Sequence, residues 1–227
     1  MRAVPAECGG HMRKILILTN KEDIHADLVL RELKRRGRAV IRLHPDEFPN
    51  RITMTYKNGV VQVVIPDSKI SFSTDEVGSV WYRRPRPPAI DSNIANQAAR
   101  NFAATESSHF VENVYGCLEH AKWVNPYYAG RRARNKLLQM EVGKRHGLIF
   151  PRTIVSNDPE EMRAFFESCA GEVVYKSVRV GLLHDTDGSS RLIFTTRLTL
   201  EDIALLRGLR SAICIWPYAA TLLYADE

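Results

Sequence analysis

Hydrophobic positions at the start of the chain form short apolar runs separated by a helical repeat. The run at 13–19 is continuous enough to predict a buried parallel strand. A helix is expected next, capped by Asn20 and ended by Gly37. Its apolar positions fall on one face: Ile24, Leu28, Val29 and Leu33. A second strand at 39–43 completes a β-α-β unit, which implies a right-handed crossover.

The pattern then changes to that of an antiparallel hairpin. Alternating residues at 51–56 and 60–65 flank an Asn58-Gly59 pair, a strong signal for a two-residue turn. A further strand at 77–81 runs directly into the segment 82–88. Three prolines in that segment exclude a continuing helix or a central strand.

The second half of the chain alternates predicted helices with short strands. Helices are expected at 92–120, at 129–146, from Asp158-Pro159 onward, and at 199–209. Strands are expected at 151–156, 172–178, 192–196 and 212–216, the middle two as an antiparallel pair. We place a domain boundary near residue 125. The predicted parts are a leader or cloning remnant at 1–12, one domain at 13–125 and another at 126–227.

Composition narrows the class of protein. The 227 residues are 44% hydrophobic and 26% charged, which is typical of a folded globular chain. No apolar run is long enough for a membrane-spanning helix, and no membrane partner is expected. The four cysteines are scattered, so we expect reduced thiols in a cytoplasmic protein and assign no metal ligand. The net charge of +6 is the only feature that favours nucleic acid, which is therefore not the expected partner.

Two kinds of basic residue are candidates for chemistry. Lys136 lies in a predicted helix and Lys176 in an otherwise apolar strand, and either ammonium could hold a phosphate. Arg83, Arg84 and Arg86 stand on the proline-stiffened loop, and arginine forks suit carboxylates and phosphates. Solvated surface charge is the alternative for all five. No Walker loop, GxGxxG, HExxH or GxSxG motif is present, and no catalytic residue is assigned.

An ordered set of short motifs resembles the ATP-grasp ribosomal peptide maturases of the microviridin, or graspetide, type. The similarity extends over roughly 12–215 and lies in the order of the motifs. They are Val80 to Pro85, Glu106 to Cys117, Trp123 to Pro126, Asn135-Lys136 with Gln139, Gly147 to Thr153, Ser156 to Pro159, Tyr175 to Val178, and Ile193 to Thr196.

This resemblance implies an α/β pre-ATP-grasp domain followed by an ATP-grasp α+β domain that is incomplete here. It implies that Lys136 and Lys176 contact ATP phosphates, with ATP and Mg²⁺ as cofactors of the complete family enzyme. It also implies a ligase that activates a side-chain carboxylate of a precursor peptide as an acyl phosphate. Attack by a hydroxyl or an amine then gives an ω-ester or ω-amide crosslink. An acidic peptide is the expected partner of Arg83, Arg84 and Arg86, and a homodimer is compatible with the resemblance.

The chain departs from the family pattern after Cys214-Ile215. The family's Gln-Glu hinge, which reads adenine, and its acidic-x-Asn metal ligands have no match here. A truncated piece, a frameshifted reading and a natural pseudoenzyme all fit this departure. We therefore expect this chain to bind nucleotide weakly or not at all. The alternative function is a non-catalytic peptide-binding module derived from such an enzyme.

Overall fold

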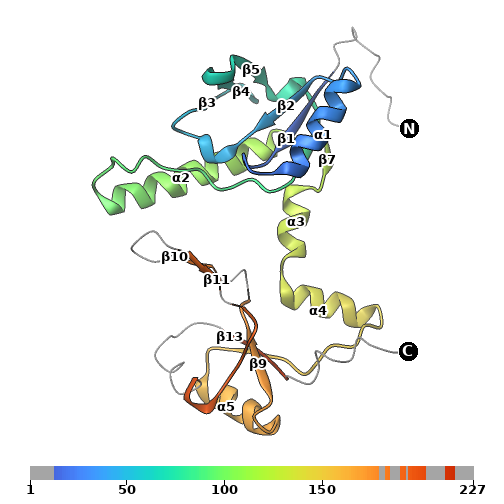
Figure 1. The fold of residues 1–227 in the computed structure, drawn as a ribbon, viewed down its shortest axis with the longest axis vertical. Coiled ribbons are helices and arrows are strands. Elements are labelled where there is room, and N and C mark those ends of the chain that lie inside the picture. Colours follow the sequence, from blue (N-terminus) through green and yellow to red (C-terminus); the bar gives the residue numbers. More distant parts are fainter. Residues whose placement is uncertain (1–12, 179–181, 185–189, 193, 203–212, 218–227) are drawn as a thin grey trace. The chain divides into compact units, whose positions relative to one another are not determined.

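The computed structural model describes residues 13–178, 182–184, 190–192, 194–202 and 213–217 (Figure 1). The chain divides into two compact units, residues 1–130 and 131–227. The division falls inside helix α3 (Tyr127–Ala133), shortly after the boundary that the sequence suggests. Within the described ranges, no helix is both long and apolar enough to cross a bilayer.

A four-stranded parallel sheet organises the first unit. Its strands lie in the order β2-β1-β6-β7, and all neighbouring pairs are parallel. Their bounds are β1 (Lys14–Leu18), β2 (Val40–Leu43), β6 (Val77–Tyr82) and β7 (Lys122–Val124). Helix α1 (Ile24–Arg35) connects β1 to β2, so the predicted β-α-β unit is confirmed (Figure 1).

The predicted cap of α1 is wrong, and the apolar face of the helix is largely exposed. Asp23, not Asn20, is the N-cap residue, and the helix begins three residues later than expected. Ala26 is the helix residue that is fully buried, whereas Ile24 and Leu28 are 67% and 59% exposed. The apolar stripe of α1 is therefore not the face that the first unit buries.

The predicted hairpin is confirmed, and a third strand joins it. β3 (Thr53–Lys57) and β4 (Val60–Ile65) pair antiparallel up to the Lys57–Val60 partners. Asn58 and Gly59 both have positive φ, 51° and 86°, as a type I′ turn requires. The sequence did not predict β5 (Ile70–Ser73), which pairs with β4. Short 3-10 helices occur at Pro45–Glu47, Pro66–Ser68 and Thr74–Glu76.

One hydrophobic core joins the two sheets of the first unit to helix α2 (Gln97–Gly116). Leu16 and Leu18 of β1 contribute to it, together with Phe72 of β5 and Val111 of α2. The helix is shorter than the predicted span 92–120, because Asn96 accepts a hydrogen bond from the Ala99 amide at 3.0 Å and caps it. The core is thus built from segments far apart in the sequence.

The second unit contains an antiparallel sheet covered by a helix. The strand order is β12-β9-β13-β8, with bounds Thr196–Arg197, Val173–Lys176, Ile213–Pro217 and Ile154–Ser156. Helix α5 (Pro159–Ser168) packs on it through Met162 and Phe166, which contact Val173. Asp158 caps α5 as predicted, accepting from the Glu160 amide at 2.9 Å. β10 (Leu182–His184) and β11 (Ser190–Leu192) form a separate pair.

The single helix predicted at 129–146 is two helices, α3 and α4 (Lys136–Arg145). The Asn135 side chain accepts a hydrogen bond from the Leu138 amide at 3.1 Å and so starts a new helix. Of the predicted pair at 172–178 and 192–196, β9 is confirmed, and its described partner β12 begins only at Thr196. The predicted helix at 199–209 lies mostly outside the described residues.

Candidate functional site

The carboxyl ends of β1 and β6 form the first candidate site. The chain leaves β1 through α1 toward β2 on one side, while β6 pairs with β1 on the other. Such a reversal of strand order is where open parallel sheets bind their ligands. The Arg83 amide donates to the Leu18 carbonyl at 3.0 Å, which keeps the arginine loop at this edge.

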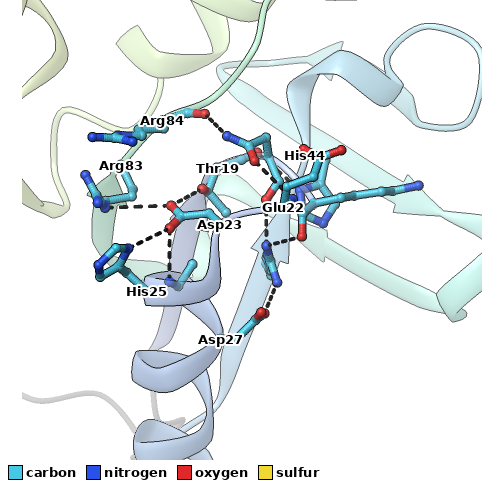
Figure 2. A network of polar contacts seen from close by, with 12 residues as sticks. Thr19, Glu22, Asp23, His25, Asp27, His44, Arg83 and Arg84 are labelled. Carbon is cyan, nitrogen blue, oxygen red and sulfur yellow. Dashed lines mark hydrogen bonds and ion pairs between the residues drawn. The ribbon is translucent and has the colours of Figure 1, made fainter.

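A buried carboxylate organises this edge (Figure 2). Asp23 accepts hydrogen bonds from the Thr19 hydroxyl at 2.7 Å and from the Ala26 amide at 3.4 Å. The Arg83 guanidinium and the His25 ring each lie 3.7 Å from its oxygens. Burial alone raises the pKa of Asp23, but the two hydrogen bonds and Arg83 outweigh it and lower the pKa below 3.8.

The three predicted arginines have different surroundings. Arg83 pairs with Asp23 and is half-buried, and Arg86 forms an exposed ion pair with Glu22 at 3.0 Å. The Arg84 backbone carbonyl accepts from the Asn20 side chain at 2.8 Å. Among the residues that the structure describes, none forms a hydrogen bond or ion pair with the exposed Arg84 guanidinium. Figure 2 shows this side chain extending to the same side as Arg83.

Sequence reasoning missed the residues that support this loop. The sequence placed Asp23 three residues after an Asn20 cap, whereas Asp23 is itself the cap. Arg42 of β2 forms an ion pair with Asp27 and donates to the carbonyls of Asn20 and Lys21, at 2.5 and 3.0 Å. A charged residue inside the short apolar strand β2 was the available signal, because such a residue requires partners.

Acid titration should reveal the contribution of Asp23. We expect Asp23→Asn to lower the free energy of unfolding at neutral pH by about 1–2 kcal/mol, since it weakens charge-assisted hydrogen bonds. Because folding lowers the pKa of Asp23, its contribution is present above pH 3.8 and is lost as the pH falls through the folded pKa. Urea unfolding from neutral to acid pH should therefore give a shallower pH dependence for the variant. Equal slopes for Asp23→Asn and the exposed control Asp67→Asn would contradict this.

The second candidate site lies in the second unit, where Lys136 contacts the backbone of the residue after Lys176. Lys136 is the first residue of α4, directly after the Asn135 cap. Its ammonium group donates a hydrogen bond to the carbonyl of Ser177, the residue that follows Lys176. The fold thus brings the Lys136 ammonium group to the backbone beside Lys176, 40 positions later in the sequence.

Strand alternation places Lys176 on the face of the sheet away from α5. Val173 and Tyr175 pack in the cluster that α5 covers, so Val174 and Lys176 point to the opposite face. Lys176 is exposed at the end of its strand.

The lysine pair has the charge needed to hold a polyphosphate. Within the described part of the chain, no group of three His, Cys, Asp or Glu side chains could hold a metal ion. The residues on this face therefore fit the phosphates of ATP, but the described residues do not provide a magnesium site. No step through magnesium is assigned here.

Solved structures with the same fold define the class of protein. MdnC from Microcystis aeruginosa MRC, bound with precursor peptide MdnA, is 24% identical, with a TM-score of 0.80 over 90% of this chain and 67% of that one. MdnB from the same organism is 27% identical, with a TM-score of 0.73 and the same coverage. A Chryseobacterium gregarium RiPP-associated ATP-grasp ligase, in complex with ADP and a leader and core peptide, is 25% identical, with a TM-score of 0.72 over 91% and 62%.

The chain thus has the fold of ATP-grasp ligases and spans about two thirds of their length. The predicted class, an α/β pre-ATP-grasp domain followed by an ATP-grasp α+β domain, is confirmed. The family model of the MvdD pre-ATP-grasp domain matches residues 14–131, more than half of the chain. The chain belongs to this family, and the predicted resemblance to graspetide maturases is confirmed. No curated protein sequence matches it.

Proposed function

We propose that the chain acts in ATP-dependent ligation of a peptide, with the second unit holding ATP phosphates and the first unit binding the peptide. The observation that carries this proposal is the approach of Lys136 to the backbone beside Lys176. MdnC was solved with a precursor peptide, and the Chryseobacterium ligase with ADP and a peptide, which supports both halves of the proposal.

The proposed reaction converts a peptide carboxylate into a good acyl donor. A side-chain carboxylate oxygen attacks the terminal phosphorus of ATP, and ADP leaves. A hydroxyl or amine of the same peptide then attacks the acyl carbon, loses its proton and displaces phosphate, leaving an ester or amide. Lys136 and Lys176 stabilise the phosphate charge during the transfer, because fixed cations act most strongly where charge develops. Magnesium, when bound, would share this neutralisation.

Mass spectrometry of a peptide substrate tests the function. The protein would be incubated with MgATP and the MdnA precursor or a synthetic peptide rich in Asp, Glu, Ser and Lys. The expected product has lost one water per crosslink, with ADP formed in step. Peptide binding with no ATP-dependent loss of water would instead support the non-catalytic binding module.

Arg84 is the best candidate among the three arginines for direct contact with an acidic peptide. The guanidinium groups of Arg83 and Arg86 are already paired with Asp23 and Glu22. Arg84 lies at the same sheet edge with an exposed guanidinium, so a peptide carboxylate can form a bidentate pair with it at no cost to an existing ion pair. Arg83 and Arg86 then mainly stabilise the conformation of the loop.

We expect Arg84→Ala to weaken the binding of an acidic peptide about fivefold, the effect of losing one charge-assisted contact at an exposed position. Fluorescence anisotropy of a fluorescein-labelled peptide of Asp and Glu residues would measure the affinity. Arg86→Ala is the matched control on the same loop and should change the affinity less than twofold. Unchanged affinity in Arg84→Ala, or an equal loss in both variants, would contradict the assignment.

A further inference from the structure

An aromatic pocket of about 310 Å³ lies in the first unit, where the end of α2, strand β7 and the start of α3 meet. Its walls include Tyr115, Trp123, Tyr127 and Tyr128, and the carboxylate residue Glu119 also lines it. None of these residues belongs to the arginine loop or to the lysine pair. A volume near the lower end of ligand sites, about 300 Å³, is ample for one side chain.

The rings around this pocket meet at steep angles. Tyr115 and Tyr127 have centroids 5.0 Å apart at 60°, and Tyr127 and Tyr128 are 5.1 Å apart at 72°. Trp123 lies 6.1 Å from Tyr115 at 77°. Rings at such angles form adjoining walls and do not stack, which is the arrangement of aromatic cages that hold organic cations.

The polar groups of the pocket favour a positive ligand. The Trp123 indole N–H is already donated to the Leu118 carbonyl at 2.8 Å, so it does not offer its hydrogen to an anion. Glu119 is exposed, and its carboxylate makes no hydrogen bond or ion pair with any residue that the structure describes. The pocket thus has a carboxylate beside it although the chain as a whole has a net charge of +6.

Burial favours the uncharged form of the Tyr115 phenol, which lines the pocket. It raises the pKa of the Tyr115 phenol, and neighbouring Tyr82, Tyr127 and Glu112 raise it further. The phenol is therefore protonated at any physiological pH, and its ring keeps the negative π face that attracts cations.

We propose that this pocket binds the cationic side chain of a lysine or arginine carried by a peptide. The aliphatic stem packs against the rings, and the ammonium or guanidinium group lies over their faces near Glu119. This assignment goes beyond the ligase function and does not depend on it, since it concerns recognition alone.

Blocked tripeptides provide a direct test. Acetyl-Gly-Lys-Gly-amide would be titrated into the ¹⁵N-labelled chain, with the Trp123 indole N–H as the NMR reporter. The norleucine tripeptide keeps the apolar stem and lacks the charge, and we expect it to bind about tenfold more weakly. Equal or tighter binding of the norleucine peptide would overturn the proposal in favour of an apolar pocket, and so would the absence of binding by either peptide.

Two variants and one further probe sharpen the result. Glu119→Gln should weaken the lysine peptide about threefold while leaving the norleucine peptide unchanged, because only the charge is removed. Lys122→Gln, outside the pocket on β7, should change neither. Choline tests for a free small cation, and choline binding more tightly than the lysine peptide would overturn the assignment to a peptide.

Discussion

Replacement of Lys176 with methionine is expected to lower the rate of ATP-dependent peptide modification by about 100-fold or more. This is the usual effect of removing one group that stabilises charge in the transition state. Methionine keeps most of the apolar stem of lysine and removes the ammonium group. The side chain is exposed at the end of β9, on the face away from α5, so the fold should tolerate the change.

Two controls distinguish the loss of the Lys176 charge from a general loss of activity. Lys144→Met, on α4, removes an exposed ion pair with Glu141 at 3.4 Å and should retain the activity of the unchanged protein. The assay uses ATP at about 1 mM, the upper range of Michaelis constants, so that weak nucleotide binding does not hide the effect. A parallel calorimetric titration with MgATP measures binding alone. If Lys176→Met changed neither the rate nor the nucleotide affinity, Lys176 would not be part of the ATP site.

Truncation of Phe72 to alanine is expected to cost the first unit about 3–5 kcal/mol of stability, the usual cost of emptying a buried aromatic site. Phe72 is only 1% exposed and pairs in register with Val63. It belongs to the core that joins the parallel sheet, the three-stranded sheet and α2. The cavity it leaves would therefore weaken the contacts of all three elements at once.

Urea denaturation followed by tryptophan fluorescence measures this loss, since Trp81 and Trp123 both lie in the first unit. Ser71→Ala is the matched control in the same strand. Ser71 is exposed on the opposite face, so its loss should change stability by no more than about 0.5 kcal/mol. A Phe72→Ala cost below about 1 kcal/mol would show that the site collapses without penalty.

Local signals in the sequence were sufficient to predict the elements that begin or turn at characteristic residues. The Asn58-Gly59 turn has the backbone that only such a pair adopts readily, and Asp158-Pro159 starts α5 as its capping pattern requires. The apolar runs of β1 and β2 also determined a parallel pair. The order of short motifs indicated the family, and the family model and solved structures confirm it. The roles of Lys136, Lys176 and the three arginines stay predictions.

Elsewhere the local pattern was misleading because neighbours distant in the sequence decided the outcome. Strand β5 has only four residues and becomes a strand because β4 offers it a free edge. In α1 the apolar stripe stays exposed and Ala26 is buried instead. Asn135, a local cap, divided a helix that periodicity alone would continue.

The sequence by itself determined the secondary structure of the strongest segments and the family. Tertiary structure alone decided which charges are already paired. Asp23 and Glu22 neutralise Arg83 and Arg86, which leaves Arg84 as the candidate for a peptide. It also brought Lys136 to the backbone beside Lys176 and closed the aromatic pocket around Glu119. The physical reason is that ion pairs, burial and ring contacts depend on distances in space, which the spacing of residues along a chain does not determine.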